Sequence, residues 1–282
     1  MRRERALELV NTDVCYLDAL SHRGGQYFVT FIDDFNRKLC AFVMKSTHQV
    51  SLVLKEFHAR AQRESGQKLK AVQIDHGGEY KCQFEMYCKS QGIKLQYTVP
   101  KTPELNCLTE RIDETIMERA RSILSHAKLP KSHWVHAILM IVYLINKYPS
   151  MPLKGDVPQR VWTGRNVFYH HLRMLGCLAH MHVAKDLRSK LDRKSKPCTL
   201  LGYSEDEFGY RLWNLLDMKV VQSRDIVFME DKRIEDWKQI KTVSSSQSVA
   251  AMESTLANPS STQLADKQKP TGEIEYEPTS TQ

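Results

Sequence analysis

An alternation of β-like and helical segments constrains the fold of this chain most strongly. Three short apolar runs come first, and further runs then alternate with segments whose apolar residues recur at helical spacing. The predicted strands are residues 7–14, 26–32, 38–44, 69–74 and 93–99, and the predicted helices are residues 47–64, 83–91, 108–126 and 132–147. Consecutive strands without a helix between them favour an antiparallel meander, and each helical crossover adds a parallel strand. The sequence therefore predicts an α/β fold with a mixed sheet and flanking helices.

The sequence changes in character after Trp162-Thr-Gly164. Four short β-like runs with intervening turns follow, and they predict a small barrel-like β module. The runs are residues 175–183, 197–203, 209–214 and 220–228. From about residue 241 the chain is rich in Ser, Thr, Gln and Pro, which predicts disorder. We therefore expect an α/β domain over residues 5–165, a β module over residues 170–235 and a disordered C-terminal tail over residues 240–282.

The overall charge and the cysteine pattern narrow the class of protein. A formal net charge of +8 favours a polyanionic partner, and nucleic acid is the leading candidate. The seven cysteines include no CxxC pair, which argues against a disulfide framework and against a cysteine-rich zinc site. The sequence contains no apolar run long enough to span a membrane and no N-terminal signal peptide. We therefore expect a protein of the nucleus or cytoplasm that is not secreted and has no membrane partner.

Three acidic residues stand where the predicted elements would bring them together. Asp13 lies at the end of the first predicted strand, Asp75 directly follows the fourth, and Glu110 falls in the first turn of the long helix. Neighbouring strands would place both aspartates at one edge of the sheet. Carboxylate oxygens select hard cations such as Mg²⁺ or Mn²⁺, and two such ions can serve a displacement at phosphorus. An acid after a strand is also an ordinary turn or cap residue, so a structural role stays open at this point.

Ordered sequence matches over residues 7–228 connect the chain to a known family. Two of them are Tyr-Phe-Val-Thr-Phe-Ile-Asp-Asp at 27–34 and Asp-His-Gly-Gly-Glu-Tyr at 75–80. Others lie at residues 11–15, 102–106, 110–111, 129–132, 143–146, 161–164, 175–177, 200–204, 209–212 and 223–228. Together they resemble the integrase of Copia-type LTR retrotransposons. That family has a catalytic Asp, Asp, Glu triad with a spacing of 35 between the second and third acids, and positions 75 and 110 also differ by 35.

The resemblance implies a fold, an activity and a set of partners. The implied fold is an RNase H-like catalytic core followed by an SH3-like β module. Asp13, Asp75 and Glu110 would be the catalytic residues and would bind two Mg²⁺ or Mn²⁺ ions. The implied activity is metal-dependent DNA integration, in which 3′ ends of transposon DNA are processed and then joined to target DNA. The partners would be these DNAs and, since such integrases work as multimers, further copies of the chain.

Several basic and polar residues are candidates for DNA binding. They are Arg111, His76, Lys101, Asn106, Lys190 and Lys194. The last two belong to a dense basic segment, which is suited to contacting phosphates. A basic residue on an exposed helix face is more often only solvated, so this alternative stays open for Arg111.

The chain departs from the family pattern around these residues. Asn11 stands in place of a His, and His76 stands in place of an Asn. The typical Glu-Arg-x-Asn-Arg becomes Glu-Arg-Ile-Asp-Glu at residues 110–114, which puts Asp113 one helical turn after Glu110. We therefore expect a fragment or a degenerate copy, and the alternative function is a catalytically inactive, DNA-binding remnant of an integrase. A ribonuclease of the RNase H type and a translated relic without a selected role are further alternatives.

Overall fold

A computed structural model gives the fold of residues 3–98, 103–203, 209–237 and 239, without the side chains of residues 103–107. Met1–Trp237 belong to one compact unit. The tail predicted to be disordered, residues 240–282, lies outside the described residues.

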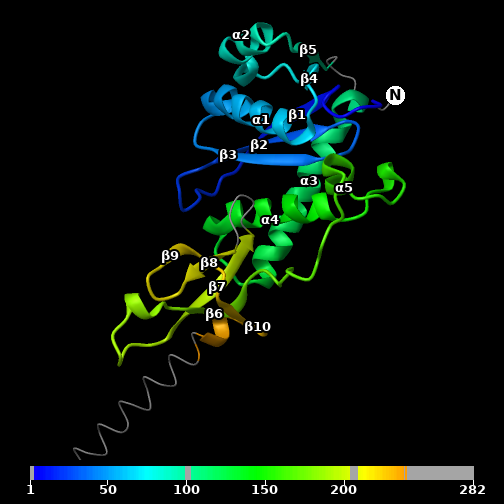
Figure 1. Ribbon diagram of the computed structural model, residues 1–282. Helices are drawn as coiled ribbons and strands as arrows, with labels where there is room; N and C mark the ends of the chain where they lie inside the picture. Colours follow the sequence, from blue (N-terminus) through cyan, green and yellow to red (C-terminus); the bar gives the residue numbers. More distant parts are fainter. Residues whose placement is uncertain (1–2, 99–102, 204–208, 238, 240–282) are drawn as a thin grey trace, which may run out of the picture. The chain divides into compact units, whose positions relative to one another are not determined.

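The first sheet has five strands in the spatial order β3-β2-β1-β4-β5 (Figure 1). The strands are β1 (Val10–Tyr16), β2 (Tyr27–Asp33), β3 (Leu39–Met44), β4 (Ala71–Ile74) and β5 (Lys94–Tyr97). The first three form an antiparallel meander, whereas β4 pairs in parallel with both β1 and β5. This arrangement confirms the predicted mixed α/β sheet and makes β1 and β4 neighbours at its centre.

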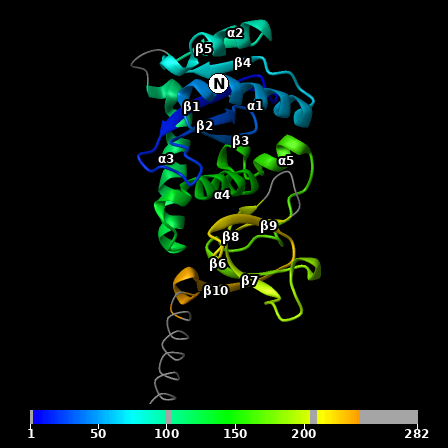
Figure 2. The ribbon, with the colours of Figure 1, turned by 90° about the vertical axis from the view of Figure 1, so that its left-hand side faces the viewer.

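Helices cover both faces of this sheet, with α1 on one side and α4 on the other (Figures 1 and 2). The α-helices are α1 (Val50–Ser65), α2 (Gln83–Ser90), α3 (Pro103–His126), α4 (Trp134–Lys147) and α5 (Pro158–Thr163). Short 3₁₀ turns occupy η1 (Thr47–Gln49), η2 (Gly78–Tyr80), η3 (Lys131–His133), η4 (Met151–Leu153) and η5 (Lys185–Leu187). The predicted helices are all present, and α5 is a further helix that the sequence analysis did not predict.

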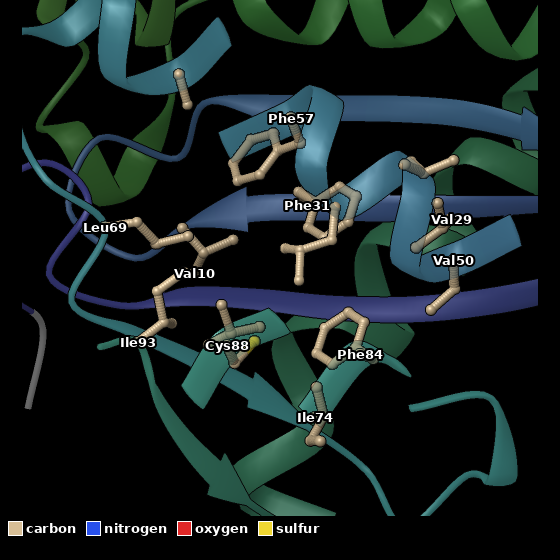
Figure 3. Close-up of a cluster of buried hydrophobic side chains, with 14 of the residues drawn as sticks. Val10, Val29, Phe31, Val50, Phe57, Leu69, Ile74, Phe84, Cys88 and Ile93 are labelled. Carbon is tan, nitrogen blue, oxygen red and sulfur yellow. The ribbon is translucent and has the colours of Figure 1, made fainter. Parts of the chain in front are cut away.

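One apolar cluster lies between the sheet and helices α1 and α2 (Figure 3). Phe31 of β2 stacks on Phe57 of α1 with ring centroids 4.4 Å apart. A second cluster lies between the opposite face and helices α3 and α4, where Phe28 and Ile32 of β2 meet Ile138 of α4. Side chains alternate between the two faces of a strand, so the odd and even positions of β2 serve different clusters.

Helix α3 begins earlier than predicted. The sequence places its start near residue 108, because Pro100 and Pro103 were expected to break the chain, but the helix already includes Pro103. Proline is tolerated at the first helical position, where its missing N–H would have no intrahelical acceptor. The prediction of the helix itself is confirmed, and only its first residues were wrong.

The second sheet is entirely antiparallel, with the order β10-β6-β7-β8-β9. Its strands are β6 (Cys177–His182), β7 (Ser195–Tyr203), β8 (Tyr210–Asn214), β9 (Lys219–Ser223) and β10 (Ile226–Arg233). The single run predicted at 220–228 was wrong, because it contains the end of β9 and the start of β10. The partner changes between them: Ser223 pairs with Tyr210 of β8, whereas Ile226 pairs with Met181 of β6.

Two further findings bear on the class of protein. No helix within the described residues is long and apolar enough to cross a membrane. None of the six cysteines whose side chains are described is joined to another in a disulfide.

Candidate metal centre

Asp13 lies in the middle of β1 and not at its end, which corrects the position expected from the sequence. The strand continues to Tyr16 because β2 pairs with it along its whole length, and Asp13 itself stands opposite Thr30. On its other side β1 pairs with β4 only at Val10 and Asn11. Asp13 therefore lies just beyond the point where β1 loses its neighbour β4.

The register of β1 and β4 aligns the two aspartates. Val10 pairs with Val72 and Asn11 pairs with Gln73. The same offset, continued by two residues, brings Asp75 level with Asp13. Val10 and Ile74 face the α1 and α2 side, so the alternation of strand side chains directs positions 13 and 75 to the opposite, α3 side.

Helix α3 supplies acidic side chains to this same face. The carboxylate of Asp113 accepts hydrogen bonds from Cys15 Sγ at 3.3 Å and from Thr30 Oγ1 at 3.5 Å. Glu110 precedes Asp113 by three positions, so the two side chains lie on one side of the helix. Glu110 is exposed, whereas Asp113 is only 4% exposed.

The electrostatics of Asp13 reflect these neighbours. Burial, together with the negative charges of Asp75, Glu110 and Glu79, raises the pKa of Asp13 to about 6. Its Oδ1 accepts a hydrogen bond from the backbone N–H of Val14 at 2.8 Å. Carboxylates that repel one another in a half-buried place suit a divalent cation, and an all-oxygen set suits Mg²⁺ or Mn²⁺. Asp13, Asp75 and Glu110 thus offer the type of ligand that such an ion prefers, although the group of ligand atoms within 4.8 Å of one another in the described part of the chain joins Asp13 to other residues and not to Asp75 or Glu110.

Asp113 is the acidic residue that the sequence analysis noted only as a departure from the family pattern. Burial and the negative charge of Asp13 together raise its pKa to about 7. One carboxylate oxygen of Asp113, Oδ1, is buried and has no hydrogen-bond partner. Ligand atoms of Asp13, Cys15 and Asp113 all lie within 4.8 Å of one another. The spacing of three from Glu110 was the one sequence signal that pointed to this position.

The segment after Asp75 forms a tight turn and contains two residues with rings close to the acidic site, His76 and Tyr80. Asp75 Oδ1 accepts a hydrogen bond from the backbone N–H of Gly77 at 2.9 Å. His76 contacts the carbonyl oxygen of Thr98 through Nε2 at 3.0 Å and stacks on Tyr97, with ring centroids 5.4 Å apart. The hydroxyl of Tyr80 is buried, and burial together with the charges of Asp13 and Asp75 raises its pKa well above the usual range. His76 is thus an exposed ring that the end of β5 holds in place.

The structure places the other candidates for DNA binding in two regions. Arg111 is exposed on α3 and lines a groove of about 570 Å³ together with Arg37 and Arg119. Lys190 and Lys194 are exposed in the segment between β6 and β7. Lys101 and the side chain of Asn106 lie outside the described residues, so their predicted role stays a prediction.

Two family models match the chain, and they match its two structural parts. The model described as Integrase core domain matches residues 3–103, and the model described as Retroviral polymerase SH3-like domain matches residues 177–254. The first match contains the meander and the β4–β5 pair, and the second begins at the first residue of β6.

Curated relatives from plants are similar over most of the chain. A Retrovirus-related Pol polyprotein from transposon TNT 1-94 of Nicotiana tabacum is 49% identical over 82% of this chain and 18% of its own length. A Retrovirus-related Pol polyprotein from transposon RE1 of Arabidopsis thaliana is 33% identical over 80% of this chain and 15% of its own length. The chain thus spans less than a fifth of either relative.

A solved structure is also similar. It is a chain of the simian T-cell lymphotropic virus intasome in complex with PP2A regulatory subunit B56 gamma, with a TM-score of 0.47 and 14% identity over 83% of this chain and 80% of that chain. The two family models and the two plant relatives agree with the residues that first indicated the family. The chain therefore belongs to the Copia-type retrotransposon integrases, with an RNase H-like integrase core domain followed by a retroviral SH3-like domain.

Proposed function

We propose that this chain catalyses metal-dependent DNA integration, with Asp13, Asp75 and Glu110 as its catalytic residues. The observation that carries the proposal is electrostatic: the charges of Asp75 and Glu110 both raise the pKa of Asp13 although the three residues come from β1, the end of β4 and α3. Such convergence has no evident structural purpose in an apolar sheet, because like charges brought together destabilise the fold unless a cation offsets them.

The three carboxylates would hold two Mg²⁺ or Mn²⁺ ions. Such ions lower the pKa of an attacking hydroxyl and stabilise the leaving oxygen in a displacement at phosphorus. The protein's own part is to fix its ligands on rigid elements, and the central strands of a sheet do this better than loops. Hydrolysis would process the 3′ end of the transposon DNA, and the freed 3′-hydroxyl would then attack the target DNA at the same site.

The DNA would extend from the metal site over basic side chains. Arg111 follows Glu110 on α3 and could contact a phosphate beside the reacting group. Lys190 and Lys194 belong to the SH3-like part, which we assign to residues 170–235, after a catalytic core at residues 5–165. We also propose that the chain self-associates and that it acts in the nucleus, where an enzyme that joins DNA to a chromosomal target would work.

A second candidate function is DNA binding with the chemistry lost. The observation that favours it is Asp113, a buried acid where the family pattern has Asn. The charge of Asp13 raises the pKa of Asp113, so the two acids interact and Asp113 changes the environment in which metal ions would bind. The two functions differ in whether a divalent ion supports cleavage, and not in whether DNA binds.

An assay of cleavage and joining on a DNA duplex separates the two. With Mn²⁺ or Mg²⁺, wild type should cut and join the duplex, and Asp75→Asn should lower the rate by a factor on the order of 100 or more. Asp186→Asn, an exposed acid of the SH3-like part, serves as the matched control and should behave as wild type. DNA affinity is measured for all three by fluorescence anisotropy.

Each other outcome identifies a different function. If wild type and Asp75→Asn are both inactive and bind DNA equally, the chain is a DNA-binding module. If wild type degrades the RNA strand of an RNA–DNA hybrid but does not join DNA, it is a ribonuclease.

A further inference from the structure

Cys15 and Asp113 lie beside Asp13 on the α3 face of the sheet. Cys15 follows Asp13 by two positions on β1, so both side chains point to the same face. One ligand atom from each of Asp13, Cys15 and Asp113 lies within 4.8 Å of the other two. Within this group, Cys15 Sγ donates a hydrogen bond to Asp113 Oδ2 at 3.3 Å.

The environment of Asp113 is independent evidence that these three residues bind a cation. Its side chain is 4% exposed, and its Oδ1 atom is buried without a hydrogen-bond partner. The other oxygen, Oδ2, takes the hydrogen bonds of Cys15 and Thr30. Within the described residues, no Lys, Arg or His forms an ion pair with Asp13 or Asp113. A buried carboxylate without a cationic partner is costly, and a bound metal ion removes that cost.

We propose that Asp13, Cys15 and Asp113 form a second cation site, which takes a thiophilic dication of the Zn²⁺ class. A sulfur ligand distinguishes this site from the all-oxygen trio, because thiolate favours Zn²⁺ over Mg²⁺. Zn²⁺ bound to sulfur and oxygen at their usual distances holds two ligands about 3.6 Å apart in a tetrahedron, close to the separation of Cys15 Sγ and Asp113 Oδ2. On binding, the thiol of Cys15 loses its proton to solvent and the sulfur forms the bond to the metal.

The site has a consequence for the proposed enzyme, although it does not depend on strand transfer. Asp13 is a ligand of both sites, so an ion held by Cys15 and Asp113 competes with Mg²⁺ or Mn²⁺ at Asp13, Asp75 and Glu110. Zn²⁺ would then inhibit cleavage even at concentrations far below those of Mg²⁺. Metal binding itself can be measured without any DNA, so the two proposals fail separately.

Titration with Co²⁺, which substitutes for Zn²⁺ and absorbs light, tests the site in the full chain with reduced thiols. Wild type should develop a thiolate-to-Co²⁺ charge-transfer band in the near ultraviolet, with saturation at one ion per chain. Cys15→Ser should lose the band, and Asp113→Asn should weaken Co²⁺ binding by a factor on the order of 10 or more. Cys82→Ser, which changes an exposed cysteine outside this group, should keep both the band and the affinity.

The outcomes that overturn the proposal are clear-cut. If folded wild type gives no charge-transfer band, or if Cys15→Ser retains it, the site does not exist as proposed. Asp75→Asn should leave the band intact, whatever its effect on DNA cleavage. X-ray absorption of wild type loaded with Zn²⁺ gives a measurement that needs no variant: one sulfur at about 2.3 Å supports the site, and a shell of oxygen or nitrogen alone overturns it.

Discussion

Asn146 of α4 forms two hydrogen bonds with the backbone of Leu39, the first residue of β3. Its Oδ1 accepts from the N–H of Leu39 at 2.9 Å, and its Nδ2 donates to the carbonyl oxygen of Leu39 at 2.7 Å. Asn146 is buried, and β3 is an edge strand of the first sheet. One side chain thus satisfies backbone groups that no further strand can reach.

Removal of this amide should destabilise the core domain. Asn146→Ala leaves two buried backbone groups of Leu39 without partners, so the free energy of unfolding should fall by about 2–4 kcal/mol. Asn166→Ala, at an exposed position, should change it by less than about 0.5 kcal/mol. Urea denaturation of both variants measures the difference, and equal effects would show that the Leu39 contact adds nothing.

The buried acid beside Asp13 should make stability depend on pH. The pKa of Asp113 is raised to about 7 in the folded chain, so its carboxyl group favours folding only in the protonated, neutral form. Its contribution is complete at pH values below the unfolded pKa and is lost as the pH rises through about 7. Asp113→Asn should therefore stabilise the chain by about 2–4 kcal/mol near pH 8, with the gain vanishing near pH 4.

The measurement is the free energy of unfolding of wild type and variant in metal-free buffer at several pH values. Asp186→Asn changes an exposed acid and should leave the pH profile of wild type unaltered. A gain for Asp113→Asn that is the same at every pH would mean that packing and not charge is responsible.

The buried His133, which lies beside His22, should make stability depend on pH in the opposite direction. Burial lowers the pKa of His133 to about 4, and the neighbouring His22, whose Nε2 lies 3.0 Å from that of His133, acts in the same direction. The neutral ring favours folding, so its contribution is present above the unfolded pKa and is lost as the pH falls to about 4. This one group should account for about 2–3 kcal/mol of acid destabilisation.

The test compares how steeply stability falls between about pH 7 and about pH 4.5. His133→Gln should flatten this fall, even if the substitution lowers stability overall. His48→Gln, at an exposed position on η1, should retain the full slope. A slope for His133→Gln equal to that of wild type would rule out a role for this ring in the acid response.

Gly176 should not tolerate a side chain. Its φ of 79° is unfavourable for other residues, and a Cβ there would come within 2.7 Å of the Cα of Ala127. Gly176→Ala should cost about 2–5 kcal/mol, since backbone strain and overlap add together. Gly155→Ala has a similar φ of 87° but open space, so it should cost only about 1–2 kcal/mol. Thermal unfolding of the two variants separates overlap from strain, and equal losses would contradict the close contact.

The basic segment between β6 and β7 should contribute to DNA binding through charge alone. Replacement of Lys190 and Lys194 by Ala should weaken binding to duplexes of any sequence and should reduce the slope of log K against log salt by about 1–2. The double replacement of Lys68 and Lys89 removes the same charge from exposed positions of the core domain. Anisotropy titrations at several salt concentrations measure the slopes, and identical slopes for the two double variants would exclude a specific role of the segment.

The sequence was sufficient for the sheet but not for all of the acidic site. Apolar periodicity predicted the strands, and the crossover through α1 made β1 and β4 plausible neighbours, so the alignment of Asp13 with Asp75 could be expected. The length of β1 beyond Asp13 could not, because it depends on pairing with β2. Asp113 looked like one more charge on a helix, since its burial comes from the packing of α3 on Thr30 and Cys15. The hydrogen bonds of Asn146 to Leu39 could not be predicted either, because they depend on how α4 packs against β3.

The mid-strand position of Asp13 has a consequence for how this chain can change in evolution. A strand shows alternate residues to opposite faces, so one inserted or deleted residue between Val10 and Asp13 would turn the carboxylate toward α1 and α2 without breaking the sheet. Length changes in the connection through α1 would be absorbed outside the strands. Copies of the gene with a single-codon insertion between Val10 and Asp13 should thus no longer direct the Asp13 carboxylate to the α3 face, although the protein would still fold.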